Sequence, residues 1–250
     1  MDVPLASDFG RFDQLVRRFA VAGNFGRLPG RSWAVWIYSL TLLPVLFLLG
    51  GLWYQPYVPL GELMRDSLLV AEVSKDCCHI YYGAVSNLGV LLWAGTAAIL
   101  FFSAIVLALL GARKHRAHFV QFVLAGTLTT LLCVDDFFLV HDIVLPKFGF
   151  SETLAYVVYA AFAAVYVIYA RNEILAARWA MFLVSVVCLA LSVKIDVFMT
   201  NDSDFRLLIE DGAKLVGIAA WFSFHTETAA CTLQRLCQMG AARSEVGHHA

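Results

Sequence analysis

Two short stretches of this 250-residue chain contain side chains that could perform chemistry within an otherwise apolar sequence. The first, DDFFLVHD, spans residues 135–142, and the second, EDGAKLVG, spans residues 210–217. Carboxylates combined with an imidazole are ligands that suit Zn, Mn or Fe, and they are also common acid–base groups. A lysine among carboxylates can neutralise one of them or bind an anionic group. Both stretches are therefore candidates for a catalytic or metal-binding site.

The hypothesis assigns a role to each of these side chains. Five of them, together with Asp196 from the stretch VKIDVF (193–198), are predicted to be ligands of a divalent metal: Asp135, His141, Asp142, Glu210 and Asp211. Asp136 is predicted to be a catalytic base, and Lys214 to neutralise a carboxylate or hold an anionic head group. The metal could be Zn, Mn, Fe or Ca, because carboxylates with an imidazole suit the first three and carboxylates alone suit Ca. Such an ion would activate water or polarise a carbonyl or phosphoryl group.

The positions of the acids indicate that their charge must be offset. Four of them lie at the C-terminal ends of predicted helices, where the helix dipole opposes a negative charge: Asp135, Asp136, Asp142 and Asp196. Glu210 and Asp211 begin a helix, where carboxylates are favourable and capping is the simpler explanation. Lys194 and Lys214 leave an excess of four negative charges in this group. Three outcomes are open, namely raised pKa values, a water-filled vestibule or a bound metal.

The elements that position these side chains are predicted to be transmembrane helices. The chain is 60% hydrophobic and 15% charged, with a mean hydropathy of +0.74, whereas a soluble domain is about half apolar and a quarter charged. Six stretches are long and apolar enough to span a bilayer: 33–53, 80–111, 118–140, 153–170, 177–199 and 209–231. The sequence thus predicts an all-α, polytopic transmembrane helix bundle with six spans, and a seventh is conceivable. Residues 1–32 would form a basic N-terminal segment, 33–231 the membrane domain and 232–250 a tail.

Lys and Arg are distributed unevenly between alternate loops. Twelve lie in the N-terminal segment, in the loops after the second and fourth spans and in the tail, whereas four lie in the other loops. Positively charged loops stay in the cytoplasm, so both termini are predicted to be cytoplasmic and the carboxylates to lie outside. The predicted location is a bacterial inner membrane. If the third helix continues to residue 142, Asp135 and Asp142 lie on one of its faces, two turns apart.

These residues resemble a group of largely uncharacterised bacterial integral membrane proteins. Its pattern is D-D-x-F-x-x-H-[DE] followed by E-D-x-x-K-x-x-G, and the resemblance covers about residues 120–225. It implies a helical membrane protein but no named activity. A more distant resemblance, in DCC (76–78), AVSNLG (84–89) and AWFSFHTETAA (220–230), is to alkaline-ceramidase-like membrane hydrolases. These are zinc enzymes that cleave lipid amides, but His225 stands alone where they carry H-x-x-x-H.

Three functions fit these observations. The first is a metal-assisted membrane enzyme, for example a hydrolase, that acts on a lipid or lipid-linked substrate. The second is a non-catalytic subunit or assembly factor of a membrane complex, with other membrane subunits as partners. The third is an ion- or proton-coupled transporter, which the absence of an inverted repeat makes less favoured. A nucleic-acid partner is excluded because the net charge is −1 and no basic patch with interleaved aromatics occurs.

Overall fold

Long helices make up most of the structure, a computed structural model that describes residues 30–74, 78–110, 115–177, 179–199 and 203–248. Within these residues every regular element is helical. Five helices are long and apolar enough to cross a membrane: α2 (Gly30–Tyr54), α5 (Ala84–Leu109), α6 (Arg116–Phe138), α8 (Glu152–Ala176) and α9 (Trp179–Phe198). The predicted all-α transmembrane bundle is therefore confirmed. The predicted N-terminal segment lies almost entirely outside the described residues.

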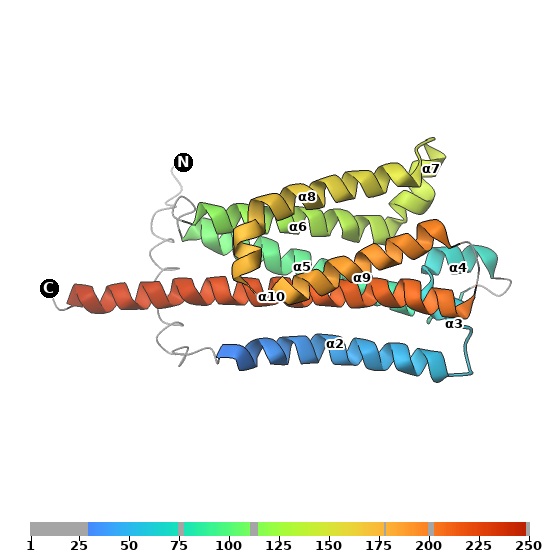
Figure 1. The fold of residues 1–250 in the computed structure, drawn as a ribbon, viewed down its shortest axis with the longest axis horizontal. Coiled ribbons are helices and arrows are strands. Elements are labelled where there is room, and N and C mark those ends of the chain that lie inside the picture. The colour runs from blue at the N-terminus through green and yellow to red at the C-terminus, as the bar shows by residue number, and fades with distance from the viewer. Residues whose placement is uncertain (1–29, 75–77, 111–114, 178, 200–202, 249–250) are drawn as a thin grey trace, which may run out of the picture.

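The sixth predicted span lies within α10 (Asp204–His248), which is more polar than the other long helices and is not among those five. Its polar side chains face its neighbours, since Ser223, His225 and Glu227 are all buried. Figure 1 shows α10 running the length of the bundle beside α2, α5 and α9 and continuing beyond it at the C-terminal end. Because surrounding helices cover its polar atoms, α10 can cross an apolar layer despite its composition. The predicted tail is helical up to His248.

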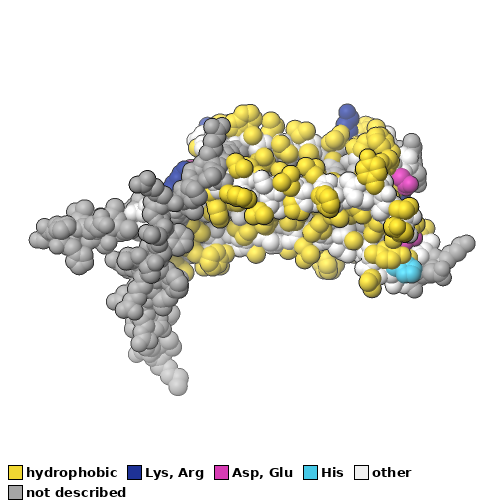
Figure 2. Space-filling model, turned by 90° about the horizontal axis from the view of Figure 1, so that it is seen from below, with side chains coloured by type: hydrophobic (Ala, Val, Ile, Leu, Met, Phe, Trp, Pro, Cys, Tyr) yellow, Lys and Arg dark blue, Asp and Glu magenta, His cyan; other side chains and the backbone are white. Residues whose placement is uncertain are grey.

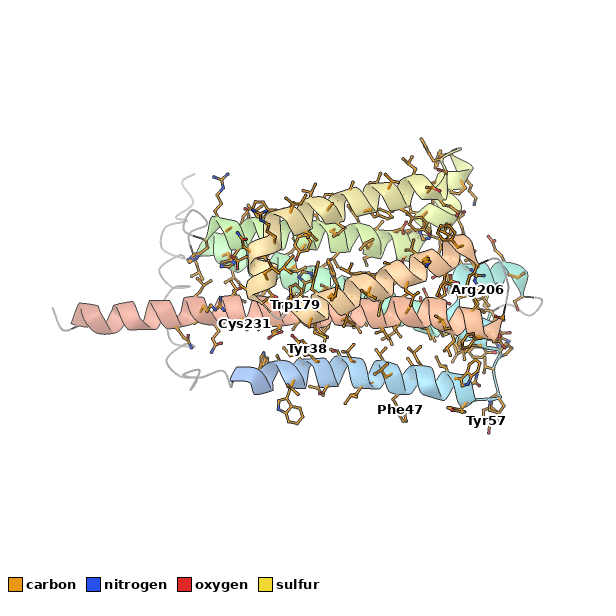
Figure 3. The ribbon with its side chains drawn as sticks, in the orientation of Figure 1. Tyr38, Phe47, Tyr57, Trp179, Arg206 and Cys231 are labelled. Carbon is orange, nitrogen blue, oxygen red and sulfur yellow. The ribbon has the colours of Figure 1, made fainter. Side chains whose placement is uncertain are left out.

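Apolar side chains occupy both the interior and the outer surface of the bundle. Trp93, Leu100, Phe122 and Tyr166, from α5, α6 and α8, are at most 2% exposed and form part of the core. Hydrophobic side chains also cover most of the face seen in Figure 2, and Phe47 points away from α2 (Figure 3) with 84% of its surface exposed. An apolar surface of this extent is suited to contact with lipid tails and not with water.

The end of the bundle at which α10 begins also collects the short elements (Figure 1). Helices α3 (Leu60–Met64) and α4 (Ser67–Val73) connect α2 to α5. A π-helix, η1 (Val140–Val144), and the single turn α7 (Leu145–Lys147) connect α6 to α8. Gly83 precedes α5 with φ +64°, and a Cβ there would lie 2.6 Å from the backbone nitrogen of Ser67. Only glycine fits this close approach, which brings α4 against the start of α5.

Candidate functional site

Helix α6 ends at Phe138 because the next residue leaves the right-handed helical conformation. Leu139 has φ 50° and ψ 49°, a left-handed conformation that non-glycine residues rarely adopt, and its backbone N–H still bonds to the carbonyl of Asp135. The Leu139 side chain is only 2% exposed, so burial of this side chain stabilises the strained turn. The condition under which Asp135 and Asp142 would share a helical face, that the helix continues to residue 142, is therefore not met. The chain instead resumes as the π-helix η1, an element frequently found at functional sites.

This turn brings His141 back onto Asp135. The backbone N–H of His141 donates to Asp135 Oδ1 at 3.0 Å, and the ring Nδ1 lies 2.6 Å from Asp135 Oδ2. The Tyr159 hydroxyl of α8 also donates to Asp135 Oδ1, at 2.9 Å. Asp135 and His141 are 5% and 8% exposed. Both carboxylate oxygens of Asp135 are thus occupied by donors, and Asp135 fixes the position and the ring orientation of His141.

The other ring nitrogen of His141 faces a second carboxylate. Nε2 lies 3.3 Å from Asp142 Oδ1, and the imidazole ring centre is 5.2 Å from that of Tyr156. Burial alone would lower the pKa of His141, but the Asp135 hydrogen bond and the charges of Asp142 and Asp135 outweigh it and raise that pKa. Burial also raises the pKa of Asp142, against the attraction of His141. The pKa values of both groups therefore lie above their ordinary values, and for Asp142 this is a shift toward neutral pH, where acid–base groups work best.

Asp136, the neighbour of Asp135, points to a different set of partners. Its Oδ1 lies 3.0 Å from Lys214 Nζ of α10, and Trp93 Nε1 of α5 donates to its Oδ2 at 2.8 Å. Asp136 therefore ties α5, α6 and α10 together at one level. Lys214 lies where it neutralises a carboxylate, which is one of the two roles proposed for it from the sequence.

Two of the remaining predicted ligands, Glu210 and Asp196, lie beside partners of their own. Glu210 Oε2 is 3.0 Å from Arg206 in the first turn of α10, and Asp196 accepts a 2.8 Å hydrogen bond from the Tyr156 hydroxyl. Arg206 lies at the charged end of the bundle (Figure 3). The sequence reasoning considered Arg206 only as a loop charge. Its spacing of four residues from Glu210 was the signal that could have revealed the pair.

A single cavity of about 1370 Å³ joins all of these groups. Every candidate site residue lines it: Asp135, Asp136, His141, Asp142, Asp196, Glu210, Asp211 and Lys214. Tyr156 and Tyr159, which the sequence reasoning missed, line it from α8. They are one helical turn apart, so they share a face of α8. The wall continues with apolar side chains of α6, α8 and α9, and with Trp93 and Trp221.

The described residues contain no group of three or more His, Cys, Asp or Glu side chains arranged to hold a metal ion. The six predicted ligands line one cavity, but five of them (Asp135, His141, Asp142, Asp196 and Glu210) lie against the separate partners described above. The 3.3 Å between His141 Nε2 and Asp142 Oδ1 is about the distance between two ligands of one tetrahedral Zn²⁺, each about 2.1 Å from the ion. The hydrogen bond from His141 Nδ1 to Asp135 would then orient a metal ligand. These two residues could supply part of a coordination shell, and the metal site stays a prediction.

Comparison with known proteins places the chain in a family without assigning an activity. The profile of DUF8692, a domain of unknown function, matches residues 37–228. The chain belongs to this family, because the match covers most of its length. No curated protein and no solved structure matches the chain. The resemblance to alkaline-ceramidase-like hydrolases therefore has no support from these comparisons, and the function has to be argued from the cavity itself.

Proposed function

We propose that this protein is a membrane-embedded enzyme that acts on an amphiphilic, lipid-like substrate, with His141 as its acid–base residue. The observation that supports the proposal most strongly is that the pair His141–Asp142 and a deep apolar wall line the same cavity. Catalysis of this kind needs a proton-transferring group within reach of the substrate and a site that orients the substrate beside it.

The lining of the cavity changes character along the helices. Leu128 precedes Asp135 by about two turns of α6, and Trp221 follows Lys214 by about two turns of α10, so the apolar wall lies roughly 10 Å deeper than the charged groups. Ala163 of α8 and Val186 of α9 belong to this deeper wall. A molecule that fills both regions has a polar head and an apolar tail. A membrane lipid or lipid-linked molecule has this form.

The Asp135–His141 geometry suits transfer of a proton. Asp135 accepts a hydrogen bond from the Nδ1–H of His141. Nε2 is therefore the nitrogen that takes up or releases a proton, on the side of the ring that faces Asp142. From there His141 could activate water for attack or protonate a leaving group, with Asp142 accepting or returning the proton. Asp135 acts through His141 and is a positioning residue.

A second form of the mechanism involves a divalent metal at the same place. The separation of His141 Nε2 from Asp142 Oδ1 and the hydrogen bond of Nδ1 to Asp135 are the observations that favour it. Water or substrate would complete the shell, and the ion would supply Lewis-acid activation of water. In this form His141 is a ligand and the proton acceptor is Asp142 or another carboxylate of the cavity.

We also propose that the charged end of the bundle faces the outside of a bacterial inner membrane and that both termini are cytoplasmic. The support is the uneven distribution of Lys and Arg along the chain. Reporter fusions after residues 114 and 174 should report a cytoplasmic location. An outside location at both positions would reverse the orientation of the site.

The enzymatic proposal is tested by incubating purified protein in nanodiscs made from a total lipid extract of the source cells. We expect the wild-type protein to deplete one lipid species and form a product, as followed by mass spectrometry. His141→Gln should abolish this conversion while keeping the folded, monodisperse protein. Glu152→Gln is the matched control, because Glu152 is exposed and does not line the cavity. Identical lipid profiles for wild type and His141→Gln would refute the proposal.

A further inference from the structure

The cavity is strongly acidic, and this property bears on the head group it would accept. Among the described residues that line it, ten are Asp or Glu and four are Lys or Arg. The carboxyl groups outnumber the cations, and the surrounding apolar wall provides little screening of their charge. A negatively charged head group would add to this repulsion, whereas a positively charged one would reduce it.

Lys214 and Arg206, which line the cavity, are engaged by carboxylates. Lys214 Nζ lies 3.0 Å from Asp136, and the guanidinium of Arg206 lies 3.0 Å from Glu210. Neither side chain is free to bind a phosphate, because the cation would first have to give up its carboxylate partner. The role suggested from the sequence in which Lys214 holds an anionic head group is therefore less favoured than its role in neutralising Asp136.

A small, partly open pocket beside the main cavity provides a place for a positive group. It has room for about 20 Å³ and is lined by three carboxylates, those of Asp66, Asp136 and Asp211, together with Lys214 and Ser86. Ser86 donates its hydroxyl hydrogen to Asp66. A space of about 10–15 Å³ measured in this way already holds a water molecule, and an ammonium group is of similar size. Asp136 is paired with Lys214, so the carboxyl groups of Asp66 and Asp211 are the ones that would attract an added positive group.

We infer that the substrate of this cavity carries a primary ammonium in its head group and no net negative charge, with the ammonium seated between Asp66 and Asp211. Asp66 is the N-cap residue before α4 and Asp211 lies in the second turn of α10, so the head group would bridge these two helices. Its tail would follow the apolar wall past Leu128 and Trp221. This inference rests on the proposed function, because it names the substrate class for the same cavity.

The test compares two single-chain amphiphiles of equal tail length, an alkylamine and an alkyl phosphate, added to the protein in neutral-detergent micelles at neutral pH. We expect the alkylamine to raise the Tm by several degrees and the alkyl phosphate to leave it unchanged or lower it, because a ligand that binds the folded state stabilises it. Asp211→Asn and the double variant Asp66→Asn/Asp211→Asn should lose this rise. Glu152→Gln should retain it, which separates binding in the cavity from a general effect of charged micelles.

The possible outcomes separate this inference from the proposed function. Stabilisation by the alkyl phosphate that equals or exceeds that by the alkylamine overturns the inference about charge and leaves the lipid-like substrate in place. An alkylamine effect that persists in the double variant also overturns the inference, since the ammonium would then bind elsewhere. If neither amphiphile changes the Tm while the lipid-conversion assay is positive, the inference alone fails. If both experiments are negative, the proposed function fails with it.

Discussion

The carboxylate of Asp135 holds His141 at two points, since one oxygen lies 2.6 Å from the ring Nδ1 and the other accepts the backbone N–H at 3.0 Å. The two residues are six positions apart, so this double contact exists only because the chain turns sharply after α6. The backbone of the turn and the side chains of the site therefore stabilise each other. A substitution in the turn should therefore disturb the site, and a substitution in the site should destabilise the turn.

Asp135→Asn should weaken this turn more than the loss of one ordinary hydrogen bond. The amide can accept at only one atom, and its NH₂ group would face a donor, so we expect a loss of roughly 1.5–3 kcal/mol in the free energy of unfolding. Tyr159→Phe is the comparison, because it removes a single donor from Asp135 and should cost about 1 kcal/mol. Denaturant unfolding in detergent micelles measures both. Equal losses in the two variants would show that the double contact contributes nothing special.

Substitutions at Leu139 should reverse the usual order of helix-forming residues. Leu139→Ala and Leu139→Gly both remove a buried side chain, which typically costs about 2–5 kcal/mol. Glycine, however, relieves the strain of the left-handed conformation, worth about 1–2 kcal/mol. We expect the glycine variant to be the more stable of the two, although glycine is the poorer residue inside a helix. An alanine variant of higher stability would indicate that the turn is not strained.

The stability of the protein should depend on pH through His141. Its pKa is raised above the ordinary 6.5 in the folded state, so the folded state binds this proton more tightly than the unfolded chain. The stabilisation is complete below pH 6.5 and is lost as pH rises through the folded-state pKa. The Tm difference between wild type and His141→Gln should therefore be constant below about pH 6.5 and shrink as the pH rises above it. Asp142→Asn should shift this loss to lower pH, and a pH-independent difference would contradict the raised pKa.

The metal-assisted form of the mechanism makes a separate prediction. If His141 and Asp142 bind a divalent ion, added Zn or Mn should raise the Tm of protein first treated with a chelator, because the bound ion stabilises the folded state. His141→Ala and Asp142→Asn should each abolish this rise, and Glu152→Gln should keep it. Metal analysis of the purified protein provides an independent readout. If neither the chelator nor added Zn, Mn or Ca changes the Tm, the metal-assisted form is excluded and the acid–base form of the mechanism remains.

The sequence predicted the coarse architecture well because hydropathy is a direct consequence of the membrane environment. Five of the six predicted spans match long apolar helices, and the candidate residues of distant segments do line one cavity. Common depth in the bilayer was enough to bring them to one end of the bundle. It was not enough to show which residue touches which.

The partners could not be predicted because they depend on where α6 ends. Leu139 is an unremarkable residue in the sequence, yet its left-handed conformation breaks the helix and brings His141 onto Asp135 instead of leaving it on a neighbouring helical face. The roles of the Tyr156 and Tyr159 hydroxyls could not be predicted either, because an aromatic residue near a membrane boundary usually belongs to the interfacial belt. Both depend on tertiary packing, which periodicity does not encode.

The most direct test of the central claim is the protonation of His141 itself, measured by NMR on protein with ¹⁵N-labelled histidine and assigned by comparison with His141→Gln. If Asp135 orients His141 as an acid–base residue, its neutral ring carries the proton on Nδ1, and Nε2 gains the second proton with a midpoint above 6.5. In Asp135→Asn the tautomer preference should weaken and the midpoint should fall. A neutral ring protonated on Nε2, or a midpoint below 6.5 in the wild-type protein, would contradict the account.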